Sequence, residues 1–184
     1  FAFAHPERVE ALVILNSFPH FASQLRLALA SAGLNVLPWG AMRLLRRLTA
    51  WRLHSRHTDS AEVKRFIQLT TDATRRGYLN RLQLLRHYDV RLQLDRLEPP
   101  ALFLAAEEDH LVPAAAHARY MAERAPRGTF RLLHGHGHIC LIAPDLDLSD
   151  IIDRWRSEPP VTSQQISLSE GLSNARAAGH ATDN

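Results

Sequence analysis

An uncharged run of six residues, Ala101–Ala106, ends abruptly in three acidic residues, and this feature constrains the fold more than any other. The run shows no alternation of polar and apolar residues, which is typical of a parallel strand that helices cover on both faces. Glu107, Glu108 and Asp109 follow at its carboxyl end, where open α/β sheets place their ligand chemistry. The sequence therefore predicts an α/β fold with a parallel sheet and a functional acidic loop.

A second predicted strand, Thr129–Leu133, leads into the segment His134-Gly135-His136-Gly137-His138. An acid and a histidine after neighbouring strands form two thirds of a catalytic triad, in which the carboxylate fixes the imidazole tautomer and the imidazole takes a proton from a nucleophile. Asp109 is the sharpest acid candidate, because Leu111-Val112-Pro113 anchors the far side of its loop. His138 is the matching histidine.

The three histidines also allow a second hypothesis. If the segment is extended, their imidazoles line one face and could bind zinc or another transition metal. However, Gly135 and Gly137 are poor strand residues, which favours a tight catalytic loop. A structural zinc site normally needs four ligands, and no other Cys/His pair stands at ligand spacing. We therefore expect no metal and no cofactor.

The chain divides into a sheet-forming core and a helical insertion. Residues 1–17 contain the end of an apolar helix and a buried strand at Ala11–Leu15, and residues 98–156 form the C-terminal core. Residues 18–97 show helical periods without a comparable strand, so we interpret them as a cap, or lid. Residues 157–184 are rich in Ser, Pro, Gln, Ala and Gly and predict a disordered tail.

Helix boundaries follow from apolar stripes and capping residues. In the predicted cap, one stripe runs from Ala41 to Trp51, and a capping box at Asp59 starts a helix that we expect to stop at Gly77. A further helix is predicted from Tyr78 to about Tyr88. In the core, we expect a helix from Pro113 to about Arg124 and a closing helix that carries Leu148, Ile151, Ile152 and Trp155.

Other reactive or charged residues are weaker candidates. Cys140 follows His138 closely, but its apolar neighbours indicate a small buried residue rather than a nucleophile. Ser17 follows a strand, yet it lacks the small neighbours that a nucleophile elbow needs. The basic residues between Arg43 and Arg56, with Trp51, could contact phosphates, but a solvated cap surface fits their amphipathic pattern better.

The composition sets limits on the class of protein. The 184 residues suffice for one domain with a core, and the hydrophobic share of 46% and charged share of 22% are ordinary for a soluble protein. No apolar run reaches the ~18 residues of a membrane span. Cys140 is the single cysteine, which favours a reducing, cytoplasmic compartment. The net charge of +3 comes from arginine, with Lys64 the sole lysine, and does not indicate a nucleic-acid partner.

The sequence resembles the C-terminal part of an α/β-hydrolase-fold enzyme. F-A-F-A-H-P-E-R-V-E-A-L-V-I-L-N-S, at Phe1–Ser17, is similar to the helix and strand that follow the family's G-x-S-x-G nucleophile elbow. F-L-A-A-E-E-D-H-L-V-P is similar to its acid loop, and G-H-G-H-I-C-L to its histidine loop. The resemblance extends from Phe1 to about Arg156, and the order of acid and histidine agrees with the family's order of Ser, Asp and His.

This resemblance implies that Asp109 is the triad acid and His138 the general base. Asn16 occupies the place where some members carry their acid, and it is not ionisable, which supports Asp109. Ala106 replaces the family's usual glycine in the acid loop. The chain contains no G-x-S-x-G. The resemblance thus predicts a nucleophile, either Ser, Asp or Cys, and an oxyanion hole upstream of Phe1, so that the chain is a fragment truncated just after the elbow.

We therefore expect part of a hydrolase that cleaves a small, apolar, ester-like substrate beneath the cap, whereas the chain alone is inactive. The expected partner is a small molecule, and neither a nucleic acid nor a membrane. The alternative is a non-catalytic ligand- or metal-binding protein that uses the loop from His134 to His138.

Overall fold

A computed structural model describes residues 1–21, 23–38, 40–41, 53–69 and 74–158. The predicted apolar stripe up to Trp51 lies almost wholly outside these residues, as does the predicted tail beyond Glu158. None of the helices among the described residues combines the length and the apolar character of a membrane-spanning segment.

A parallel sheet forms the core and confirms the predicted α/β class. It contains β1 (Leu12–Leu15), β2 (Ala101–Ala106) and β3 (Gly128–Leu133), in the spatial order β1-β2-β3. Leu15 of β1 pairs with Leu104, and Ala106 at the end of β2 pairs with Leu133 at the end of β3. The carboxyl ends of β2 and β3 are therefore level, and the loops that follow them start side by side.

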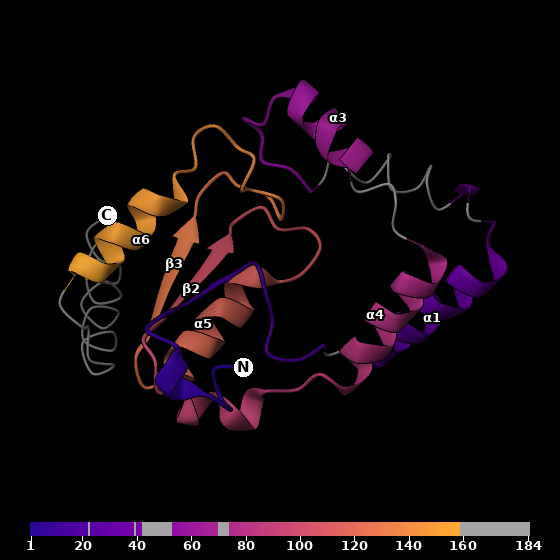
Figure 1. The fold of residues 1–184 in the computed structure, drawn as a ribbon. Helices are drawn as coiled ribbons and strands as arrows, with labels where there is room; N and C mark the ends of the chain where they lie inside the picture. The colour runs from indigo at the N-terminus through magenta and orange to yellow at the C-terminus, as the bar shows by residue number, and fades with distance from the viewer. Residues whose placement is uncertain (22, 39, 42–52, 70–73, 159–184) are drawn as a thin grey trace, which may run out of the picture.

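The central strand β2 is buried along its whole length. Ala101, Phe103 and Ala105 pack on one face, against α5 (Ala114–Arg124), while Leu102 and Leu104 face the opposite side with Trp155 of α6 (Leu148–Ser157). Figure 1 shows the sheet between these two helices. Burial on both faces is the reason why the sequence of β2 shows no alternation.

Helices α1 (Gln24–Val36), α3 (Ser60–Leu69) and α4 (Arg75–His87) lie in the segment that we predicted to be a cap. α1 and α4 lie side by side, apart from the sheet, and α3 lies beyond the carboxyl ends of the strands (Figure 1). Two short 3-10 helices, Pro6–Arg8 and Arg91–Arg96, precede β1 and β2.

The predicted helix stop at Gly77 is wrong. Gly77 lies in the first turn of α4, where its N–H donates to the hydroxyl oxygen of Thr74 at 3.1 Å. Thr74 is thus the N-cap of a new helix, since its side-chain oxygen accepts the N–H of the third helical residue. Gly77 suggested a helix end because glycine is common just after the last residue of a helix, whereas Thr74 marks a helix start.

Candidate active site

The acid loop after β2 holds the carboxylate of Asp109 in one orientation. Its Oδ1 accepts the main-chain N–H groups of Leu111 at 2.8 Å and Val112 at 3.1 Å, which forms a tight turn around the side chain. Its Oδ2 lies 2.8 Å from Nδ1 of His138, and the Asp109 side chain is only 1% exposed. Both oxygens of the buried carboxylate therefore have partners.

These contacts determine the ionisation of Asp109. Burial alone would raise the pKa of its carboxyl, but the hydrogen bonds from His138, Val112 and Leu111 outweigh it and hold the pKa below the ordinary value. Asp109 is therefore ionised at neutral pH and can only accept hydrogen bonds. It follows that a neutral His138 carries its proton on Nδ1 and presents Nε2 as a base.

The two glutamates beside Asp109 point to other partners. Glu107 accepts from the main-chain N–H of Gly135 at 3.2 Å and contacts Nδ1 of His134 at 3.3 Å, and these bonds lower its pKa. Glu108 forms an ion pair with Arg56 at 2.9 Å. Of the acidic triplet, the structure brings Asp109 alone to His138.

The three histidines of the loop likewise face three different partners. His134 is exposed beside Glu107, His136 is buried with its Nδ1 3.0 Å from the hydroxyl of Ser55, and His138 contacts Asp109. No group of three or more metal-binding side chains is present among the described residues. The extended face that the metal hypothesis requires is thus not formed, because Gly135 turns the chain with a φ of +72°.

Gly137 lets the segment 53–55 approach the histidine loop closely. A Cβ at this position would lie only 2.6 Å from the carbonyl oxygen of His54. The N–H of Ile139 donates to the carbonyl oxygen of Leu53 at 2.6 Å, and the N–H of Gly137 donates to Ser55 Oγ at 3.2 Å. Ser55 thus fastens residues 53–69, which we call the α3 segment, to the loop that carries His138. No local sequence signal indicates this role, since the partners of Ser55 are more than eighty residues away.

Asn16, directly after β1, is a second residue whose role the sequence did not indicate. It is 7% exposed, and its amide joins the end of β2 to the histidine loop. In the sequence, Asn16 stood out only as a place where an acid is absent.

Cys140 is fully buried, as its apolar neighbours predicted. Burial raises the pKa of its thiol and so disfavours the thiolate that a nucleophile requires. Its sulfur accepts a hydrogen bond from the Asn16 amide at 3.6 Å.

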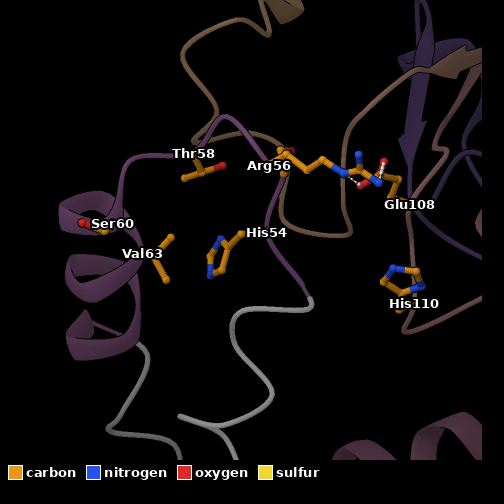
Figure 2. A pocket seen from close by; sticks show the side chains of 8 residues that line it. His54, Arg56, Thr58, Ser60, Val63, Glu108 and His110 are labelled. Atoms are coloured by element: carbon orange, nitrogen blue, oxygen red, sulfur yellow. Dashed lines mark hydrogen bonds and ion pairs between the residues drawn. The ribbon is translucent and has the colours of Figure 1, made fainter.

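A cavity of about 570 Å³ lies between the α3 segment and the acid loop (Figure 2). All of its lining residues except Val63 are polar or charged, namely His54, Ser55, Arg56, Thr58, Ser60, Glu108 and His110. Glu108 and His110 flank Asp109, and the main chain of His54 pairs with Ile139, next to His138. The cavity is therefore adjacent to the acid–histidine pair.

Two polar side chains of this cavity have buried atoms without a hydrogen-bond partner in the described part of the chain. These are both ring nitrogens of His54 and the hydroxyl of Thr58. Burial lowers the pKa of His54, so its ring is neutral at pH 7 and offers one donor and one acceptor. Buried polar atoms normally have hydrogen-bond partners, and these three atoms have almost no surface accessible from the cavity.

The parallel sheet with helices on both faces, and an acid and a histidine in contact beyond its strands, are arranged as in the α/β-hydrolase fold. No family model matches the sequence. The chain is 30% identical over 141 residues to a Yersinia enterocolitica protein named as a carbamate hydrolase, RutD, a match that covers 74% of this chain and 50% of that protein. The chain thus spans about half the length of this curated relative.

Solved structures show the same fold. An esterase from Thermogutta terrifontis has a TM-score of 0.69 at 18% identity, with 84% of this chain and 58% of that one covered. An enol-lactonase from Burkholderia xenovorans has a TM-score of 0.62 at 16% identity, with 84% and 57% covered. The chain has the α/β-hydrolase fold, as its resemblance predicted.

Proposed function

We propose that the chain carries the acid and the base of a hydrolase that cleaves a small carbonyl substrate. The observation that carries this proposal is the 2.8 Å contact between Asp109 Oδ2 and His138 Nδ1, made by a carboxylate that is 1% exposed. Such a carboxylate holds the imidazole in the tautomer that can accept a proton and stabilises the imidazolium that forms.

In this mechanism, Nε2 of His138 takes the proton of the nucleophile as the nucleophile attacks the substrate carbonyl carbon. The imidazolium then gives this proton to the leaving group, and the carbonyl–leaving-group bond breaks. In the second half, Nε2 takes a proton from water, whose oxygen attacks the acyl intermediate, and returns it to the nucleophile. Asp109 remains ionised throughout.

We place the nucleophile outside the printed chain. Cys140 is unsuitable because burial raises its pKa, and the hydroxyl of Ser55 is buried and bonded to His136 and Gly137. A nucleophile upstream of Phe1, as the resemblance implies, would fit the position of His138 at the carboxyl ends of the strands.

The cavity suggests a neutral substrate of modest size. Its volume lies within the ~300–1,000 Å³ of small-molecule sites. Because Arg56 is paired with Glu108 and the His54 ring is neutral, the lining offers little net charge. This supports a neutral ester or carbamate. The name of the Yersinia relative agrees with the carbamate class.

The test compares this chain with a longer protein that includes the sequence encoded upstream of it. Hydrolysis of p-nitrophenyl acetate and of phenyl carbamate is measured for both. We expect turnover by the longer protein and none by the 184-residue chain. In the longer protein, His138→Ala and Asp109→Asn should each lower kcat by about 10⁴-fold.

His134→Ala is the matched control, because this imidazole lies in the same loop but faces Glu107. It should leave kcat within about twofold, since exposed side chains away from the reacting atoms contribute little. Full activity of the His138→Ala variant would refute the proposal.

A further inference from the structure

Asn16 ends β1 in an unusual backbone conformation. Its φ is +47°, the one positive value at a non-glycine residue among those described. Asparagine tolerates this left-handed conformation better than most residues do. The turn directs the Asn16 side chain into the space beyond the end of the sheet, where it is 7% exposed.

The Asn16 amide takes over hydrogen bonding where β1 stops. Its main-chain N–H still donates to the carbonyl oxygen of Leu104, as a strand residue would, at 3.0 Å. Beyond this point β1 offers no further partner to β2, and Oδ1 of Asn16 accepts the N–H of Ala106 at 2.6 Å. The Asn16 side chain thus accepts the N–H of Ala106, the last residue of β2, which would have no partner in β1.

The other end of the amide binds the histidine loop. Nδ2 of Asn16 donates to the main-chain carbonyl oxygen of His138 at 2.8 Å and to the sulfur of Cys140 at 3.6 Å. One side chain therefore joins the residue at the start of the acid loop, Ala106, to the main chain of the proposed base. An apolar side chain of equal size would leave a buried N–H and a carbonyl oxygen without partners.

We propose that Asn16 is a positioning residue, which sets the contact between Asp109 and His138 by tying the ends of β1 and β2 to the His138 main chain. Asp109 stands three residues after Ala106, and His138 follows a loop that contains two glycines. The positions of Asp109 and His138, which are 2.8 Å apart, are thus both set by the amide of Asn16. The catalytic meaning of this role depends on the proposed function, whereas the effect on the imidazole can be measured without turnover.

The test follows the tautomer of His138 by NMR in the full chain with ¹⁵N-labelled histidine. In the wild type, we expect the Nδ1–H tautomer to dominate and to show a far-downfield Nδ1–H resonance from the bond to Asp109. Asn16→Gly keeps the backbone conformation and removes the amide, and Asn16→Ala removes the amide with some backbone strain. Both should lose the downfield resonance and populate the two tautomers comparably.

Thr129→Val is the control for general destabilisation. It removes the hydroxyl that accepts the indole N–H of Trp155 at 3.1 Å, near the opposite end of β3 from the histidine loop. It should leave the His138 tautomer and the downfield resonance unchanged. An Asn16→Gly variant that retains both signals, or a Thr129→Val variant that loses them equally, would overturn the proposal.

A measurement on the wild type covers the case in which the Asn16 variants do not fold. The side-chain amide protons of Asn16 should exchange slowly with solvent and show a nuclear Overhauser contact with the His138 main chain. Fast exchange without that contact would equally overturn the proposal.

Discussion

The close approach of the α3 segment to the histidine loop makes Gly137 a sharp site for testing the structure. In Gly137→Ala, the new methyl group would lie 2.6 Å from the carbonyl oxygen of His54 and 2.9 Å from that of Leu53. Both neighbours are backbone atoms, so no side-chain rotation relieves the contact. The two segments must therefore separate.

The structure sets the size of the expected effect. Separation weakens the bond from the Ile139 N–H to Leu53, the bond from the Gly137 N–H to Ser55, and the bond between Ser55 and His136. Hydrogen bonds contribute about 1 kcal/mol each, and overpacking costs about 1–3 kcal/mol. Because the segments separate, the overpacking is relieved and the cost comes mainly from the three weakened hydrogen bonds. We therefore expect the free energy of unfolding to fall by about 2–4 kcal/mol.

Gly135→Ala is the matched control, two residues away in the same loop. No atom beyond Gly135 and its two chain neighbours lies within 4 Å of the added methyl group, so the variant carries only the strain of a φ of +72°. That strain costs about 1–2 kcal/mol. The free energy of unfolding is measured by urea denaturation, and hydrogen exchange of the Ile139 amide reports on the separation itself. Equal stability of the two variants, with Ile139 still protected in Gly137→Ala, would refute the reasoning.

Two further predictions concern stability. The pKa of Asp109 is held below its ordinary value, so its ionised form stabilises the fold above about pH 4, and this contribution is lost as the pH falls through the depressed pKa. Asp109→Asn should therefore flatten the acid limb of unfolding free energy against pH, and an unchanged acid limb would contradict this. Ser55→Ala should cost about 1–2 kcal/mol in urea denaturation, because it leaves two buried partners unpaired. Exposed Ser60→Ala should stay within about 0.5 kcal/mol, and equal losses in both would count against the role of Ser55.

The sheet could be predicted because its signals are local. The uncharged run at Ala101–Ala106 became β2 with the predicted bounds, and the predicted strands at Ala11–Leu15 and Thr129–Leu133 each differ from the structure by one residue. Burial on both faces leaves a continuous apolar run, which needs no knowledge of the rest of the fold. The proximity of Asp109 and His138 was predictable for the same reason, since level strand ends bring their loops together.

The supports of the site could not be predicted in this way. Ser55 and Asn16 act through partners more than eighty residues away in the chain, and neither has a neighbour pattern that marks a buried hydrogen bond. Gly137 appeared only as a poor strand residue, whereas its function is to admit a backbone from another segment. Each of these roles depends on tertiary contacts that local propensity does not encode.

The alternating loop from His134 to His138 shows how one motif serves three separate contacts. Its side chains would share one face if the chain were extended, which is the basis of the metal hypothesis. Because the chain turns at Gly135, the three imidazoles instead contact different side chains. His134 contacts Glu107, His136 contacts Ser55 and His138 contacts Asp109. The first two contacts hold the loop to the acid loop and to the α3 segment, and Asn16 holds its main chain. His138 can therefore keep a fixed tautomer although two glycines precede it, because the loop is anchored on each side of the imidazole.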